Sequence, residues 1–146
     1  MTLPTHIILG AIIGKVTGNY SLAVVASIAP DLDHFSSYIK NGVIKNPRKL
    51  WHTITNEGDP YGDQRGIFHN IVFFILASII LILVFKNLGW IMVAGWFGHI
   101  ILDALDASDY WPLYPNKSFN LKGFVKYFSK QEILLFLILF VIYIIL

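Results

Sequence analysis

The sequence predicts an all-α fold, a polytopic membrane helical bundle, and three observations lead to that class. Hydrophobic residues make up 55% of the 146 residues and charged residues only 14%, against roughly 25% charged residues in a typical soluble domain. The mean hydropathy is +0.62. The apolar residues are gathered into long runs that short polar segments separate. A chain of this length fits one membrane-embedded domain, residues 1–146.

The first part of the chain predicts a short helical hairpin. Residues 6–16 and 20–29 are apolar, Thr17-Gly18-Asn19 is a turn signal between them, and Pro30 ends the second segment. Each segment would form about 17 Å of helix, which is too short for a hydrocarbon core of roughly 30 Å. We therefore expect this hairpin either to pack against longer helices or to re-enter the membrane.

Two longer apolar segments predict a transmembrane hairpin. Residues 67–85 and 88–105 are each long enough to span a bilayer, and Lys86-Asn87 forms a tight turn between them. Residues 131–146 predict a C-terminal membrane helix. The polar segment at about 35–66 is expected to be an amphipathic or irregular excursion outside the membrane, with a loop at residues 58–62.

A histidine and an aspartate lie inside one of the apolar segments. His99 and Asp103 are four residues apart and therefore share one face of a helix. An ionisable pair in apolar surroundings costs several kcal/mol or more unless something compensates it. A bound metal cation would provide that compensation. The chain has no cysteine, so a metal would be held by histidine and carboxylate side chains.

Helix geometry predicts where further ligands lie. At 1.5 Å per residue, His69 and Asp103 are each about 25 Å from the turn at Lys86, and so lie at a similar depth. In the short hairpin, His6 and Asp31 are level with each other at the end away from their turn. If both turns point the same way, seven potential metal ligands converge at one membrane face. They are His6, Asp31, Asp33, His34, His69, His99 and Asp103.

Nitrogen and oxygen ligands without thiolates suit zinc, with manganese or iron as alternatives. Seven ligands exceed the needs of one tetrahedral ion and would hold two ions bridged by a carboxylate such as Asp31. Two adjacent ions form a clamp for hydrolysis of phosphoesters such as phospholipid headgroups. We expect Arg65 to hold a phosphate oxygen and Asp33 or Asp106 to act as the general base.

The distribution of charge predicts an orientation. Lys15 and Lys86 lie near the two turns, and the other Lys and Arg residues fall on the ligand side, which the positive-inside rule places in the cytoplasm. The basic segments 40–49 and 117–130 are expected to contact anionic headgroups, at about 1 kcal/mol per residue. A net charge of +2 gives no indication of direct nucleic-acid binding. The aromatic residues expected at the membrane interface are Phe68, Tyr110, Trp111 and Tyr114.

Each of these assignments has a simpler alternative. Asp33 would serve equally well as an acceptor for backbone N–H groups after a helix end. Arg65 would serve as an interfacial anchor, and Asp106 as a loop or cap residue. The alternative function is a non-enzymatic membrane protein with a structural metal site or an ion or proton path. Such a path needs polar residues through the full depth of the membrane, whereas the turn-side halves of the helices contain little besides Lys15.

Five motifs together resemble a known family. The motifs are Thr-His at 5–6, Pro-Asp-Leu-Asp-His at 30–34, Arg-Gly-x-x-His at 65–69, Gly-His-x-x-x-Asp at 98–103 and Trp-Pro-Leu-Tyr-Pro at 111–115. Over about residues 4–115 the chain resembles the membrane-bound metal-dependent hydrolases described as LexA-binding and inner-membrane-associated. That family is similar to zinc-dependent phospholipase C. The resemblance implies the same seven metal ligands and an inner-membrane location. Gln64 stands where the family usually has a histidine, so a member that keeps the fold without the activity is a third alternative.

Overall fold

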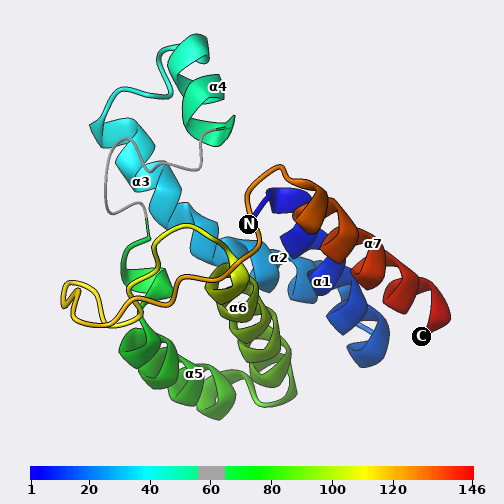
Figure 1. The fold of residues 1–146 in the computed structure, drawn as a ribbon. Helices are drawn as coiled ribbons and strands as arrows, with labels where there is room; N and C mark the ends of the chain where they lie inside the picture. Colours follow the sequence, from blue (N-terminus) through cyan, green and yellow to red (C-terminus); the bar gives the residue numbers. More distant parts are fainter. Residues whose placement is uncertain (56–64) are drawn as a thin grey trace.

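The computed structural model describes residues 1–55 and 65–146, and these residues form helices joined by turns and loops (Figure 1). The α-helices are α1 (Leu3–Thr17), α2 (Tyr20–Ile28), α3 (Leu32–Lys40), α4 (Pro47–Thr55), α5 (Ile71–Phe85), α6 (Asn87–Leu105) and α7 (Lys130–Ile145), and the 3-10 helices are η1 (Ala29–Asp31) and η2 (Ile67–His69). Within the described residues, strand-like pairing is limited to an isolated bridge between Asp106 and Val125. The all-α class is therefore confirmed for this part of the chain.

The short N-terminal hairpin is confirmed. Helices α1 and α2 lie against each other, and the turn between them contains Gly18 at φ 75°, in the left-handed region that favours glycine. Gly10 allows the close approach, because a Cβ there would overlap the side chain of Ser27 and the backbone of Val24. The hairpin thus brings the start of α1 beside the end of α2.

The hairpin packs against a longer helix. This was one of the two arrangements expected from the sequence, the other being re-entry into the membrane. Helix α2 packs against α6. A Cβ at Gly95 of α6 would overlap the side chain of Ala26 and crowd the backbone of Ala23 and Ser27. The small residues at this crossing therefore set the distance between the two hairpins.

Helices α5 and α6 form the second hairpin, with a turn at Lys86 (φ 51°). Gly89 lies directly against the carbonyl of Leu81, which closes the hairpin tightly. With 19 residues, α6 is the one helix in the described ranges that is long and apolar enough to cross a membrane, judged by length and composition. Helices α1 and α5 are apolar but shorter.

The helix predicted over residues 67–85 is shorter than expected. Residues 67–69 form η2, and α5 begins only at Ile71. The reason is Asn70, whose side-chain oxygen accepts the N–H groups of Val72 and Phe73 and so caps the start of α5. The interruption leaves His69 outside the helix, on a separate turn.

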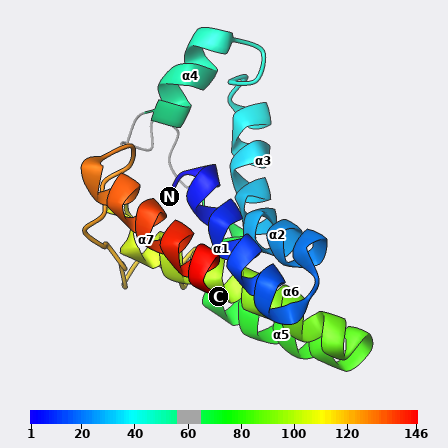
Figure 2. The same cartoon turned by 90° about the vertical axis from the view of Figure 1, so that its right-hand side faces the viewer.

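The polar excursion expected at about 35–66 contains two amphipathic helices. Helices α3 and α4 project from the rest of the molecule (Figures 1 and 2). The loop predicted at residues 58–62, and Gln64, lie outside the described residues. The described part of the excursion therefore consists of two helices joined by irregular segments.

The C-terminal membrane helix predicted at 131–146 is α7, which begins one residue earlier. Ser129 caps it by accepting the N–H groups of Gln131 and Glu132. Helix α7 packs along α1, and the amino group of Lys15 donates a hydrogen bond of 2.7 Å to the carbonyl oxygen of Tyr143. Seen in both orientations, the α1–α2 turn and the α5–α6 turn lie toward the same end of the molecule, away from the N-terminus (Figures 1 and 2).

Replacement of Gly95 tests the crossing of α2 and α6. We expect Gly95→Val to lower the free energy of unfolding by about 1–3 kcal/mol, because the added methyl groups force the two helices apart. Thermal unfolding of the detergent-purified protein measures the change. Ala94→Val is the matched control, because Ala94 is exposed on the same helix. Equal unfolding temperatures for the two variants would contradict this account of the crossing.

Candidate metal centre

The ends of four elements meet beside the last turns of α6. Three groups of ligand atoms each lie within 4.8 Å of one another: His6, Asp31 and His99; Asp31, His34 and His69; and His69, His99 and Asp103. They come from α1, η1, α3, η2 and α6. Six of the seven predicted ligands therefore lie close together, at the end of the molecule opposite the two turns, as the depth calculation expected.

His69 and His99 face each other with their Nε2 atoms 3.1 Å apart. The Nδ1–H of His99 donates to the carbonyl oxygen of Ser27 at 2.8 Å, and the Nδ1–H of His69 donates to the carboxylate of Asp33 at 3.0 Å. In the neutral rings these bonds place a lone pair on each Nε2. Two lone pairs at this distance repel, so the pair needs a proton or a metal ion. Two nitrogen ligands of one tetrahedral zinc ion are about 3.3 Å apart.

Asp103 lies at the centre of the group and is 1% exposed. Its Oδ2 is 3.2 Å from Nε2 of His69, and its Oδ1 is 3.4 Å from Nε2 of His6. Both ring nitrogens of His6 are buried without a hydrogen-bond partner among the described residues. Buried polar atoms without partners are costly. Unpartnered imidazole nitrogens beside a buried carboxylate fit a divalent metal ion.

Asp31 and His34 form the open edge of the group. Their side chains are 27% and 25% exposed, and the Nε2 atom of His34 is 3.4 Å from Oδ1 of Asp31. Burial alone would raise the pKa of Asp31, but the hydrogen bond to His34 and the nearby rings of His99 and His6 lower it to about 2. Asp31 is the one residue shared by the first two ligand groups, which agrees with the bridging position proposed for it.

Asp33 lies behind His69 rather than among the ligand groups. Its Oδ2 atom accepts the backbone N–H groups of Gly66 and Phe68 as well as Nδ1–H of His69. The simpler alternative, an acceptor for backbone N–H groups, is thus what the structure shows, although the donors belong to a distant segment. A carboxylate that fixes the tautomer of a ligand histidine is a common second partner in metal sites. The ligand and base roles expected for Asp33 stay predictions.

Arg65 and Asp106 form an ion-pair network beside Asp103. The Nε atom of Arg65 is 3.0 Å from Oδ2 of Asp103, its second nitrogen is 3.4 Å from Asp106, and its third donates to the carbonyl of Asp109. Burial opposes the charge of Arg65, but Asp103 and Asp106 raise its pKa above the ordinary value. The guanidinium is therefore already paired with carboxylates, and phosphate binding by Arg65 stays a prediction.

Asp106 is a buried acceptor with several donors. Its Oδ2 accepts a hydrogen bond of 2.5 Å from the amino group of Met1. Its Oδ1 accepts hydrogen bonds from the backbone N–H and the hydroxyl of Ser108. Burial raises the pKa of Asp106, but the amino group of Met1 and the charge of Arg65 hold it below the ordinary value. A carboxylate stabilised in this way is a weak base, and the general-base role stays a prediction.

Two residues that bond to the site histidines were not predicted from the sequence. Tyr110, expected at the membrane interface, is instead completely buried, and its hydroxyl donates to the carbonyl of His69 at 2.6 Å. The carbonyl of Ser27 orients His99. No spacing pattern identifies a carbonyl partner, but the last carbonyls of a helix lack internal partners, and Ser27 lies in the last turn of α2.

The apolar helices and this buried histidine–aspartate group define a helical membrane protein with a candidate metal centre. The family model described as YdjM inner membrane protein matches residues 1–146. The chain therefore belongs to the YdjM inner membrane protein family, and the inner-membrane location expected from the sequence is confirmed. Neither a comparison with curated proteins nor one with solved structures finds a match.

Replacement of Asp33 tests its role behind His69. We expect Asp33→Asn to weaken zinc binding by about 10- to 100-fold, because the amide no longer fixes the tautomer of the ring. Competition with a chelating dye, in detergent, measures the affinity. Asp109→Asn is the control, because the Asp109 side chain is 46% exposed and pairs with Lys122. Unchanged affinity in Asp33→Asn would show that the carboxylate does not support a metal ligand.

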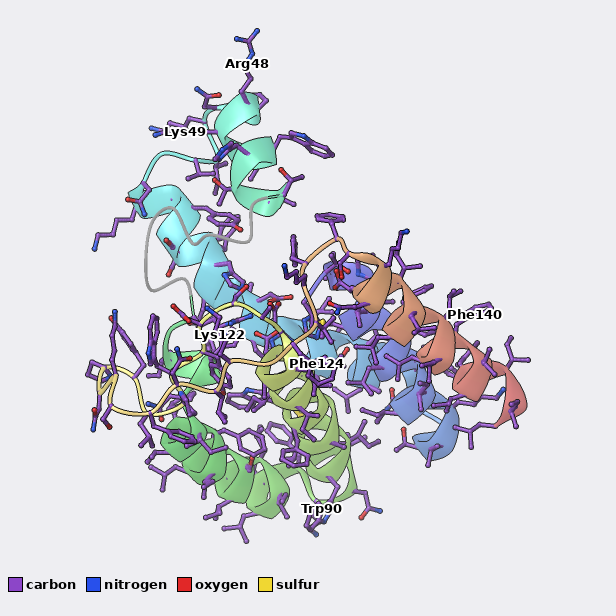
Figure 3. The ribbon with its side chains drawn as sticks, in the orientation of Figure 1. Arg48, Lys49, Trp90, Lys122, Phe124 and Phe140 are labelled. Carbon is purple, nitrogen blue, oxygen red and sulfur yellow. The ribbon has the colours of Figure 1, made fainter. Side chains whose placement is uncertain are left out.

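Replacement of Arg65 tests the ion-pair network. We expect Arg65→Gln to lower the free energy of unfolding at neutral pH by about 3–5 kcal/mol, because it leaves two buried carboxylates without their cation. Chemical denaturation in detergent measures the loss, with Arg48→Gln as a control on the projecting helix α4 (Figure 3). A loss no larger than that of the control would show that Arg65 is free for another partner.

Proposed function

We propose that this chain is a multi-pass, metal-dependent hydrolase of the inner membrane that acts on a phosphoester, such as a phospholipid headgroup, at the cytoplasmic surface. The observation that carries the proposal is the pair of Nε2 atoms of His69 and His99, 3.1 Å apart, beside the buried ring of His6, whose nitrogens have no hydrogen-bond partner among the described residues. A buried arrangement of this kind is unfavourable without a cation. Zinc is the metal we propose, with manganese or iron as alternatives.

Two ions would use the ligand groups that share Asp31. One would be held by His6, Asp31 and His99, and the other by Asp31, His34 and His69. Bound divalent ions would supply a water molecule of lowered pKa and positive charge beside a phosphoester oxygen. Other residues of the chain orient the ligand side chains. Ser27 and Asp33 hold the rings of His99 and His69 in one tautomer each.

Access to the group is one-sided. His6, His99 and Asp103 have side chains no more than 2% exposed, whereas Asp31 and His34 are about a quarter exposed. A substrate would therefore approach from the edge formed by Asp31 and His34. Water is excluded from the opposite side, where electrostatic interactions are stronger because the local dielectric constant is lower.

The proposal of several membrane passes is supported by the surface of the helices. Helices α5 and α7 expose apolar side chains around most of their circumference, among them Leu83 at 73% and Ile145 at 78%. A soluble monomer rarely exposes a patch of that extent. Helix α5 would reach about 22 Å, so local thinning of the bilayer or the adjoining η2 would complete its span.

The orientation is supported by charges at the two ends. Arg48 and Lys49 project from α4 at the end far from the turns, whereas Trp90 lies beside the α5–α6 turn (Figure 3). Basic residues gather on the cytoplasmic side of inner-membrane proteins, and tryptophan is enriched at both interfaces. We propose that the candidate metal centre faces the cytoplasm, where α4 contacts anionic headgroups.

The metal content of the detergent-purified protein tests this function. We expect roughly one to two equivalents of zinc, manganese or iron by elemental mass spectrometry, and loss of the metal in the double variant His99→Ala, Asp103→Ala. The double variant His52→Ala, Asp109→Ala is the matched control, because both residues are exposed. The metal-loaded protein is then assayed with a chromogenic phosphodiester and a short-chain phospholipid.

The outcomes separate the alternatives. Metal loss confined to the first double variant, together with hydrolysis that the same variant lacks, supports the hydrolase. Absence of metal from a folded wild-type protein after zinc is added back would overturn it. Bound metal without hydrolysis of either substrate would favour a structural metal site in a non-enzymatic membrane protein.

A further inference from the structure

A cavity that is separate from the candidate metal centre lies where α4 faces the first turns of α1 and α7. Its volume is about 380 Å³, within the usual range of about 300–1,000 Å³ for small-molecule sites. Figure 2 shows α4 above the N-terminal ends of α1 and α7. None of the seven predicted metal ligands lines it.

The walls of this cavity are mainly apolar. They include Leu3 of α1, Ile54 of α4, and Ile133 and Phe136 of α7. Glu132 is the ionisable carboxylate in the lining, but it is only 3% exposed. Its oxygens are directed to the protein, where they accept the N–H of Thr2 at 2.5 Å and the N–H of Phe128 at 2.8 Å, together with the hydroxyl of Thr5 at 3.4 Å. The cavity therefore offers hydrocarbon contact to a ligand.

An aromatic side chain is held at the cavity by an unusual backbone conformation. Phe128 has φ 53°, a region that bulky residues rarely adopt. The residue is 58% exposed and lines the cavity, and its ring packs edge-on against Tyr127 with the ring centres 4.7 Å apart. Strained backbone is retained where the surrounding structure or a ligand requires it.

Two cations flank the lining residues. Lys126 precedes Tyr127 and Phe128 in the chain, and Lys130 lies one helical turn before Ile133. Both lysines are exposed. Their charge complements a phosphate group, and the hydrocarbon walls complement an acyl chain.

The cavity is continuous with a surface that the bilayer would cover. Ile133 and Phe136 belong to α7, whose remaining length exposes apolar side chains such as Leu137 and Phe140. Phe140 points outward from the bundle (Figure 3). An acyl chain would therefore reach the cavity along α7 without leaving apolar surroundings, which favours a lipid over a water-soluble ligand.

We propose that this cavity binds one acyl chain of an anionic phospholipid, with the lipid phosphate at Lys126 and Lys130. The site does not depend on a metal ion or on hydrolase activity. Its occupant would fasten the first turn of α1 to α7 and α4 at the membrane surface.

Lipid binding to the full chain tests the site by native mass spectrometry in detergent with a metal chelator present. The probes are dioleoyl phosphatidylglycerol and dioleoyl phosphatidylcholine. We expect one tightly bound phosphatidylglycerol, with about tenfold higher affinity than phosphatidylcholine from two lysine contacts. Glycerol phosphate, which has no acyl chain, should not displace it.

Three variants decide whether the bound lipid occupies this cavity. Ile133→Trp fills the cavity from an exposed helix position and should abolish the tight binding. Lys126→Gln with Lys130→Gln should remove the preference for phosphatidylglycerol, whereas Lys86→Gln, which removes an exposed charge at the α5–α6 turn, should retain it. Equal affinity for both lipids, displacement by glycerol phosphate, or retained binding in Ile133→Trp would overturn the proposal. A dimer lost only in Ile133→Trp would identify a second chain as the occupant and would also overturn it.

Discussion

The buried carboxylate of Asp103 is the constraint on which the rest of the structure depends. It lies at the end of a long apolar helix and is 1% exposed, where an uncompensated charge costs several kcal/mol. Compensation comes from segments far apart in the sequence. The amino group of Met1, the ring of His6 and the guanidinium of Arg65 all lie within 3.4 Å of its oxygens. The packing of α1 and the position of Arg65 thus both bring compensating groups to the Asp103 carboxylate.

Close packing of helices makes that convergence possible. Small residues at Gly10 and Gly95 bring α1 and α6 against α2, so that the free carbonyl of Ser27 is 2.8 Å from the ring of His99. The end of a helix normally leaves such carbonyls to water. Here one of them determines which nitrogen of a candidate ligand is available, so local helix termination and site chemistry are linked.

The parts of this arrangement that follow from helix geometry were predictable from the sequence. The pairing of His99 with Asp103 and the equal depth of His69 need only the rise per residue. The partners of Arg65, Asp33 and Tyr110 were not predictable, because they lie in irregular segments whose positions depend on tertiary contacts rather than on periodicity. Asparagine is a common capping residue, so Asn70 indicated that α5 begins after it. The apolar run that includes Ile67 and Phe68 suggested an earlier start.

The charges around the site indicate what it requires. Among the described residues, Asp103 and Asp106 pair with the fixed cations of Arg65 and the amino group of Met1, whereas Asp31 and Asp33 face histidine rings. This leaves an excess of negative charge that the histidines must balance. They can do so by taking up protons or by holding a divalent ion. Neutral imidazole is the form that binds metal. Neutral imidazoles beside these carboxylates are therefore the set of donors that a divalent metal ion would need.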